Sequence, residues 1–357
     1  MNFLRSVRYI TIYRILGLTL IFMIFLSAGV GAVHISFREI IDFILDAAGG
    51  DPRSAVNPVH EGLFFQIRLP RTFLCFIVGA VLSVSGALMQ SVFRNPIVEP
   101  GLVGTSAGAA LGASFTFVFG KADIFAQFSF LGDLLLPVCA FSGGLIATGI
   151  VYRFSSSFGK VNVSTMILAG VAVNAMAAGG TGFLSYIARD PQARSITFWN
   201  LGTFSGADWK EVIIVFCVSV FCILLVLRYS KDLNALQLGE TEAGYLGFNA
   251  EKVKLHVILI NTLMVSVATA MVGVISFVGL TVPHLLRIVK GSDSRYLIIG
   301  SALLGGILMI TADMLARVII APAEMPIGII TAFVGGPVFL WLLFKNRRSD
   351  RKGGFYA

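Results

Sequence analysis

The chain has 357 residues, of which 56% are hydrophobic and only 13% are charged. Soluble domains carry about 25% charged residues, so this composition excludes an ordinary water-soluble protein. The net charge of +8 would suit nucleic-acid binding, but lysines and arginines lie between long apolar runs and at both ends of the chain. This placement is typical of the positive-inside bias of a membrane protein, and we expect no nucleic-acid partner.

Long apolar runs predict nine membrane-spanning helices, because each crossing needs about 20 predominantly apolar residues. In chain order the predicted segments are Ile15–Val33, Phe73–Ser91, Leu102–Phe119, Leu134–Val151, Val163–Ile187, Val212–Leu227, His256–Val278, Leu297–Ile319 and Ile327–Phe344. A tenth segment, near Gly279–Val289, is short and is interrupted by Pro283.

The charge pattern indicates that the tenth segment crosses as well. Both termini are basic, so we expect both to be cytoplasmic, which requires an even number of crossings. Ten crossings place 18 of the 27 lysines and arginines in cytoplasmic segments. The sequence therefore predicts one all-α, ten-helix transmembrane domain over residues 1–357, in the inner membrane and in contact with its lipid.

The first apolar run allows two interpretations. Arg5, Arg8 and Arg14 precede it, and Ser27-Ala28-Gly29 provide small residues, as in a cleaved signal peptide. The run Ile15–Val33 is nevertheless long enough to span, which favours an uncleaved first helix.

Two loops between the predicted helices are long enough to carry structure. The outer loop, about 34–69, has a partly helical, amphipathic pattern. The cytoplasmic loop, about 229–254, contains a short helical pattern punctuated by glycine and is too polar to span. Such a loop forms either a docking surface for a partner or a solvated connector, and its pattern alone does not separate the two.

No catalytic, metal-binding or nucleotide-binding motif is present in the sequence. HExxH, GxSxG with its partners, and the phosphate-binding GxxxxGK[ST] pattern are all missing. The four cysteines lie inside apolar runs without CxxC spacing, so we expect buried free thiols. We therefore expect no enzyme activity, no cofactor and no metal site, and any ATP must be bound by a separate chain.

Charged residues near the outer ends of the predicted helices are the main functional candidates, because charge inside a membrane is costly. Asp313 and Arg317 stand four residues apart, a spacing that allows a helical ion pair. Arg68 and Arg71 flank the outer end of the second helix. Three outward arginines could bind an acidic partner, but from these residues alone anchoring of helix ends at the membrane surface is the favoured explanation.

Several short stretches, in a fixed order from about residue 60 to the C-terminus, resemble the FecCD-type permeases, the membrane subunits of bacterial ABC importers for iron–siderophores, haem and cobalamin. The stretches that carry this resemblance are Arg68-Leu69-Pro70-Arg71, Gly86-Ala87-Leu88-Met89-Gln90, Arg94-Asn95-Pro96, Glu99-Pro100-Gly101-Leu102, Leu168-Ala169-Gly170-Val171-Ala172, Phe198-Trp199, Leu233-Asn234-Ala235-Leu236, Leu238-Gly239-Glu240, Phe277-Val278-Gly279-Leu280, Val282-Pro283-His284, Ala312-Asp313, Ala316-Arg317, Ala323-Glu324-Met325-Pro326-Ile327-Gly328 and Gly336-Pro337.

The resemblance implies the type II ABC importer architecture: ten helices per subunit, a homodimer around a central pathway, two ATPase subunits and a periplasmic binding protein. In such an arrangement Arg68, Arg71 and Arg317 dock the binding protein by charge complementarity. The family places a cytoplasmic gate around Ser164 and Thr165, although Val163 stands where a small polar residue can occur. Coupling to the ATPase falls to residues of the cytoplasmic loop, namely Leu238, Gly239, Glu240, Ala243, Leu246 and Gly247.

The resemblance leaves the transported compound open between an iron chelate, such as haem or a siderophore, and cobalamin. Glu99-Pro100-Gly101-Leu102 is closer to the haem and cobalamin members. The alternative function is a stand-alone secondary transporter, which needs buried titratable groups such as Asp313 and Glu324. A membrane enzyme is disfavoured because a catalytic constellation is missing.

Overall fold

The computed structural model describes residues 8–350 except 32, 34, 50–56, 121–122 and 158–159. Ten helices correspond to the ten predicted segments: α2 (Tyr9–Gly29), α5 (Leu69–Val92), α6 (Thr105–Phe119), α7 (Leu135–Ser155), α8 (Val163–Ile187), α10 (Trp209–Arg228), α13 (Ala250–Val272), α14 (Val278–Lys290), α15 (Ser294–Val318) and α16 (Ile327–Asp350). Among the described residues, seven helices are long and apolar enough to cross a membrane, and α6 and α16 contain shorter apolar stretches. The prediction of an all-α polytopic membrane protein is confirmed.

Shorter elements fill the loops, and both long loops are helical as expected. The outer loop contains α3 (Phe37–Ala47), α4 (Pro58–Leu63) and the π-helical turn η1 (Phe64–Arg68), while His34 lies outside the described residues. The loop predicted to be cytoplasmic contains α11 (Ser230–Leu238) and α12 (Glu240–Tyr245), and we call residues 230–247 the knob. The remaining elements are η2 (Pro100–Val103), η3 (Asp123–Leu134), α9 (Gln192–Asn200) and the antiparallel hairpin of β1 (Ser156–Ser157) and β2 (Lys160–Val161), in which Ser156 pairs with Val161.

Two predicted boundaries differ from the structure for local reasons. The first helix starts at Tyr9 rather than at Ile15. Its helical backbone includes Arg14, a charged residue at which the predicted apolar run stopped. The helix expected to reach Val278 ends at Val272, where Gly273 takes a φ of +79°. Glycine adopts this left-handed conformation without steric cost, so the chain unwinds before α14 begins.

Pro283 was expected to break the tenth segment, but α14 is continuous across it. Proline lacks the N–H that would bond the carbonyl four residues earlier, here that of Gly279. The amide of the buried Gln90 on α5 donates to the carbonyls of Gly279 and Leu280, at 3.5 and 3.3 Å. A neighbouring helix therefore satisfies the carbonyl that proline leaves free, as membrane helices require.

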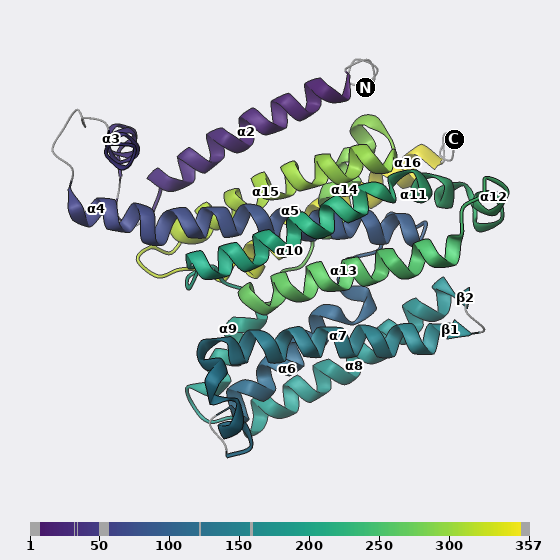
Figure 1. Ribbon diagram of the computed structural model, residues 1–357, viewed down its shortest axis with the longest axis horizontal. Helices are drawn as coiled ribbons and strands as arrows, with labels where there is room; N and C mark the ends of the chain where they lie inside the picture. The colour runs from purple at the N-terminus through teal and green to yellow at the C-terminus, as the bar shows by residue number, and fades with distance from the viewer. Residues whose placement is uncertain are drawn as a thin grey trace.

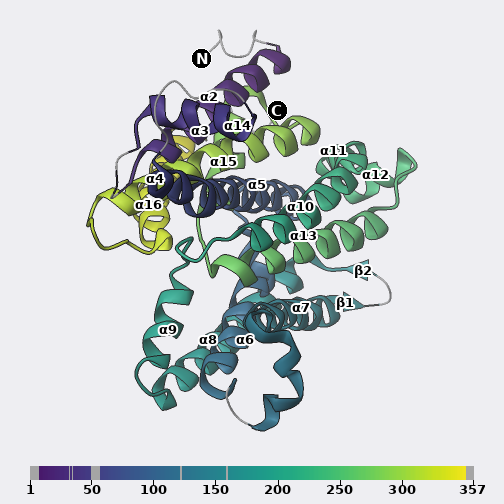
Figure 2. The same ribbon diagram turned by 60° about the vertical axis from the view of Figure 1, so that its left-hand side comes forward.

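Helix α5 forms the centre of the core, since almost all of its residues are buried. Its glycines permit close approach of two partners: a Cβ at Gly79 would overlap the backbone of Gly305 on α15, and one at Gly86 would overlap Gly279 on α14. Small residues at such positions let helix backbones pack directly in lipid. Figures 1 and 2 show α5 between α2 and α15 on one side and α13 on the other, with α6, α7 and α8 forming a separate layer beyond α13.

The two ends of the helix bundle carry different structures (Figure 1). One end, which we call the knob end, holds α11, α12, the β1–β2 hairpin, the start of α2 and the end of α16. Tyr9 stacks on Tyr296 at 4.9 Å, and Gln237 donates to Ser294 at 3.1 Å, which places α2, α11 and α15 together there. The other end, the loop end, holds α3 and α4. Both ends of the described chain thus share one end of the bundle, as an even number of crossings requires.

Candidate functional site

Three regions hold the residues predicted to function: a cluster of arginines at the loop end, the knob, and a cavity between them. The arginine cluster comprises Arg68, Arg71, Asp313, Arg317 and Glu324. Its centre is the carboxylate of Asp313 on α15, which is only 1% exposed. The Nε and Nη2 atoms of Arg71 donate to Asp313 Oδ1 at 3.0 and 2.8 Å. Arg71 lies on α5 and Asp313 lies on α15, so this ion pair joins two helices that are far apart in the sequence.

The remaining members of the arginine cluster extend this pair to α2 and to the surface. Arg317 Nε lies 3.0 Å from Asp313 Oδ2, which confirms the expected helical ion pair. Its Nη1 donates to the carbonyl of Val30 at 2.9 Å, and its Nη2 donates to Ser27 Oγ at 2.7 Å. Arg71 Nη1 also donates to both carboxylate oxygens of Glu324, at 2.8 and 2.9 Å.

Arg68 has no carboxylate partner among the described residues and is held by backbone instead. Its Nη1 donates to the carbonyls of Ala28 and Gly29 at 2.6 and 3.0 Å, and its Nη2 donates to the carbonyl of Val33. The carbonyls of Ala28 and Gly29 belong to the last turn of α2, where helix carbonyls lack intrahelical partners, and that of Val33 follows the helix. Arg68 therefore caps the end of α2.

The sequence predicts that the three arginines of the cluster face outward, but the structure shows that they are buried. Arg68, Arg71 and Arg317 are 5–7% exposed, because their guanidinium groups are enclosed by α2, α5 and α15. Of the five side chains in the cluster, Glu324 is the exposed one, at 41%. Any partner of this cluster meets Glu324 first.

The knob presents apolar side chains to the outside at the opposite end. Leu238 and Leu246 are 68% and 59% exposed, whereas Ala243 between them is buried against the bundle. Gly239 and Gly247 have φ values of +142° and +86°, which separate α11 from α12 and end α12. Glu240 opens α12 and reaches Lys254 at 2.8 Å. The predicted coupling residues therefore form one protruding unit anchored at its base.

Ser164 and Thr165 lie near the knob, in the first turn of α8. Both side chains are exposed, and the backbone N–H of Thr165 donates to Asn162 Oδ1 at 3.0 Å. Asn162 thereby caps α8, and it directly follows strand β2 of the hairpin. The predicted gate residues thus belong to a turn that is continuous with the hairpin.

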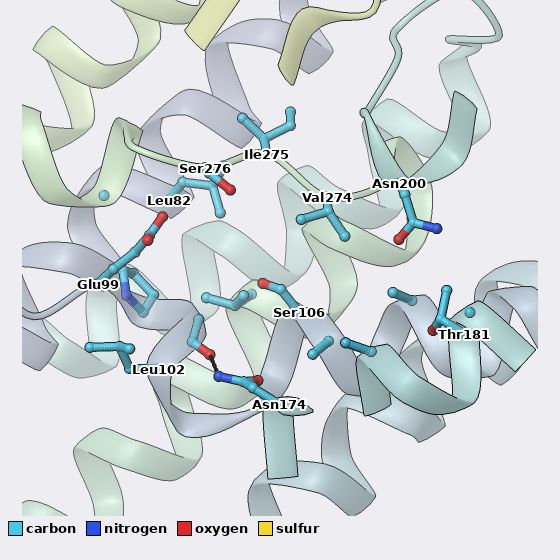
Figure 3. A pocket seen from close by; sticks show the side chains of 18 residues that line it. Leu82, Glu99, Leu102, Ser106, Asn174, Thr181, Asn200, Val274, Ile275 and Ser276 are labelled. Carbon is cyan, nitrogen blue, oxygen red and sulfur yellow. Dashed lines mark hydrogen bonds between the residues drawn. The ribbon is translucent and has the colours of Figure 1, made fainter. Parts of the chain in front are cut away.

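A cavity of about 550 Å³ lies between the two ends (Figure 3). Most of its lining is apolar. The polar side chains in the lining are Glu99, Ser106, Asn174, Thr181, Asn200 and Ser276, and Glu99 is the one carboxyl group among them. Glu99 accepts a hydrogen bond from the backbone of Phe277 at 2.9 Å, and Asn174 donates to the carbonyl of Gly101 at 3.2 Å. An apolar wall with a few polar groups is the usual composition of a ligand-binding cavity.

The sequence analysis did not single out Asn174 or Asn200, although each is a strongly polar residue in or beside an apolar run, which is an available signal. The described residues contain no group of three His, Cys, Asp or Glu side chains able to hold a metal ion. Asp313 and Glu324, the titratable groups that a secondary transporter would use, are both bonded to Arg71. The two carboxylates predicted for a proton-coupled carrier are therefore engaged in ion pairs at the loop end.

Comparison with known proteins shows which proteins this chain resembles in sequence and in fold. The chain is 39% identical to the hemin transport system permease HmuU of Yersinia pestis, over 94% of this chain and 96% of that protein. It is 36% identical to the vitamin B12 import permease BtuC of Citrobacter koseri, over 88% and 94%. A solved metal-chelate type ABC transporter in an inward-facing conformation superposes with a TM-score of 0.80 and 30% identity, over 94% and 99%.

The family model for FecCD transport proteins matches residues 19–345, which is nearly the whole chain. The relatives are permeases of importers for haem and vitamin B12, so ATP hydrolysis belongs to a partner chain rather than to this one. The protein therefore belongs to the FecCD transport family and is the transmembrane permease subunit of an ABC importer.

Proposed function

We propose that the protein acts as a homodimer that carries a bulky metal chelate or cobalamin from the periplasm to the cytoplasm. Two ATPase subunits bind at the knob end, which faces the cytoplasm with both termini, and a periplasmic binding protein docks at the loop end. The observation that carries this proposal is the placement of an exposed apolar knob and a cationic cluster at opposite ends of the bundle, with a weakly polar cavity between them.

The knob suits a groove on an ATPase subunit. Leu238 and Leu246 protrude on a short helical unit, and helices with exposed apolar side chains bind by insertion into grooves. An ATPase that moves on nucleotide binding would carry the knob with it. Gly239, Glu240, Ala243 and Gly247 would shape and anchor that unit.

The arginine cluster suits an acidic protein surface through its charge. Three guanidinium groups against the two carboxylates of Asp313 and Glu324 leave one net positive charge within the cluster. Because the arginines are buried, they act on a partner mainly through this field, which steers association and orientation. Direct contact requires Glu324 to move away from Arg71.

A second copy of the chain would complete the pathway. Helix α8 lines the cavity with Asn174 and Thr181, and it exposes Leu168, Met176 and Phe183 on its surface. A twofold partner against this region would cover apolar side chains and enclose the cavity, and twofold dimers are the commonest homo-oligomers. Ser164 and Thr165 would then stand near the cytoplasmic mouth of the pathway as its gate.

Reconstitution of the permease with its ATPase and binding protein in proteoliposomes tests the proposal. We expect ATP-dependent accumulation of one of three probes, namely hemin, a ferric siderophore or cyanocobalamin, and the probe that accumulates identifies the substrate. No ATP-dependent uptake of any probe would contradict the proposal.

A matched pair of variants tests the assignment of the knob. Leu238→Glu places a charge on the exposed knob, and we expect it to reduce co-purification of the ATPase strongly. Val59→Glu places the same charge on an equally exposed apolar side chain at the loop end and should leave that association unchanged. Equal ATPase binding by the two variants would remove the knob as the docking element.

A further inference from the structure

The knob end contains a fully buried lysine that the proposed function does not yet use. Lys254 lies in the first turns of α13 and has an exposed fraction of 0%. A lysine is almost never fully buried unless it is paired, because its ammonium group loses hydration. Its Nζ atom has three oxygen partners: Glu240 Oε1 at 2.8 Å, Glu251 Oε1 at 2.9 Å and the carbonyl of Val161 at 3.2 Å.

These three partners belong to three different elements of the knob end. Glu240 is the first residue of α12 in the knob, Glu251 lies in the first turn of α13, and Val161 belongs to strand β2 of the hairpin. Glu251 also accepts a hydrogen bond from the backbone N–H of Val161 through Oε2 at 2.7 Å. Lys254 and Glu251 therefore hold both polar groups of one backbone residue of the hairpin and connect that residue to the knob.

The hairpin continues directly into the predicted gate. Val161 is followed by Asn162, whose side chain accepts from the backbone of Thr165 and caps α8. The backbone N–H of Asn162 donates to Ser155 at 3.0 Å, which closes the hairpin onto the end of α7. A displacement of Val161 must therefore move the capping residue of α8, because adjacent residues are covalently joined.

We propose that Lys254 is the positioning residue that transmits displacement of the knob to the start of α8, through Glu240 on one side and Val161 on the other. The inference deepens the proposed function and rests on it. The route leads from Glu240 in the knob through the buried Lys254 to Val161 of β2, and from there through Asn162 to Ser164 and Thr165. It lies within one subunit.

The charges of this cluster set the position of the knob relative to the hairpin. Two carboxylates converge on one ammonium group, and the guanidinium group of Arg94 lies 4.0 Å from Glu240, so charges of the four side chains balance. Without the ammonium group, Glu240 and Glu251 repel one another. The knob and the hairpin would then separate while each remains attached to its own neighbours.

The test compares Lys254→Met, which keeps the length of the side chain and removes its charge, with Lys252→Met as its control. Lys252 lies on the same turn of α13 but is exposed. In reconstituted complexes of permease, ATPase and binding protein, we measure substrate imported per ATP hydrolysed. We expect Lys254→Met to lower this ratio severalfold, because movement of the knob would no longer reposition the start of α8, and Lys252→Met to leave it unchanged.

A distance measurement separates coupling from a purely structural role. Spin labels at Ser157→Cys on the hairpin and Tyr245→Cys on the knob, in a Cys139→Ser/Cys217→Ser background, report the separation of the two elements, since Cys75 and Cys222 are buried. We expect the wild-type separation to be the same with and without ATP, because the elements move together. With Lys254→Met we expect a separation that changes on ATP binding.

A double variant supplies the remaining control. If Lys254 acts through Glu240, Lys254→Met combined with Glu240→Gln should be no worse coupled than Lys254→Met alone. Should Lys254→Met fail to assemble, Glu240→Gln alone is measured instead, and it must lower the coupling ratio. An unchanged ratio in the variant that assembles would overturn the inference while leaving the proposed function intact. Absence of ATP-dependent uptake by the wild-type complex would instead overturn the proposed function itself.

Discussion

The arginine cluster and the lysine cluster of Glu240, Glu251 and Lys254 both hold buried cations against two carboxylates, yet they join very different elements. In the arginine cluster, Arg71 and Asp313 connect α5 and α15, two long helices whose glycines already pack backbone to backbone. In the lysine cluster, the connected elements are the short helix α12, a two-residue strand and the start of α13.

The two clusters also differ in their access to water. Asp313 is almost completely enclosed, whereas Glu240 and Glu251 retain 38% and 26% of their side-chain exposure. Loss of an arginine partner therefore leaves the carboxylate of Asp313 without solvent, whereas loss of Lys254 leaves the carboxylates of Glu240 and Glu251 partly solvated. We infer that the arginine cluster mainly stabilises the bundle, while the lysine cluster mainly sets the relative position of surface elements.

Asp313→Asn should have the largest effect on stability, because it leaves Arg71 and Arg317 buried without their shared carboxylate. Breaking a buried ion pair by removing one partner costs about 3–5 kcal/mol. Thermal unfolding of the detergent-solubilised protein, monitored by size-exclusion chromatography, measures this loss of stability. Asp46→Asn, on the exposed surface of α3, is the matched control. A melting temperature of Asp313→Asn equal to that of the control would remove the distinction between the clusters.

Lys254→Met should destabilise the fold less, even though Lys254 is fully buried. The carboxylates of Glu240 and Glu251 can rehydrate, so we expect a loss of about 1–3 kcal/mol, the range for an unsatisfied polar group. The same thermal assay applies, with Lys252→Met as control. If Lys254→Met lowered the melting temperature as much as Asp313→Asn, the lysine cluster would be a stabilising element of the same kind.

The sequence was sufficient to predict the ten helices because each leaves a long apolar run, and membrane helices satisfy their own backbone. It could not place the end of α13, since Val274 and Ile275 continue the apolar run after Gly273 has already unwound the helix. Nor could it show that Gln90 supports α14, because hydropathy carries no information about which helices are neighbours.

For the candidate functional residues, the sequence identified the residues themselves better than it identified their long-range partners and their burial. The ion pair of Asp313 and Arg317 was predicted because i,i+4 spacing is local. The bonds of Arg71 to Asp313 and Glu324 were not, because 242 and 253 positions separate the partners. Lys254 was counted as one more cytoplasmic charge; only its i,i+3 spacing from Glu251 pointed to a pair, and its burial depends on the hairpin folding over it.

Glu324→Gln should lower stability less than the two preceding variants, and it should strengthen docking of the periplasmic protein. A pair with a partly exposed partner contributes about 0–1 kcal/mol, so the melting temperature should fall only slightly. Removal of the carboxylate raises the net charge of the cluster and frees Nη1 of Arg71, so we expect tighter binding of the periplasmic protein at low salt. Binding measured at two ionic strengths, again with Asp46→Asn as control, checks this expectation. Weaker binding by Glu324→Gln would indicate that Glu324 itself contacts the partner.

The smallest expected effect concerns the pair of Glu39 and His60, which joins α3 to α4 at the exposed side of the loop end. Glu39 Oε1 lies 2.8 Å from His60 Nδ1. The hydrogen bond with His60, followed by those with Ser36, lowers the pKa of Glu39 from 4.5 to about 2. A lowered folded-state pKa means that the stabilisation is fully present above the unfolded value of 4.5 and is lost as the pH falls towards about 2.

We therefore expect Glu39→Gln to lower the melting temperature slightly at neutral pH, and the difference from wild type to shrink steadily as the pH is lowered below 4.5. Because both side chains are partly exposed, solvent screens the pair and the difference stays smaller than for Glu324→Gln. Thermal unfolding of both proteins over a series of acidic buffers measures it. A difference that persists unchanged into acid would mean that the substitution does not act through the charge of Glu39. No difference at any pH would mean that apolar contacts, such as that of Phe43 with Phe64, hold α3 instead.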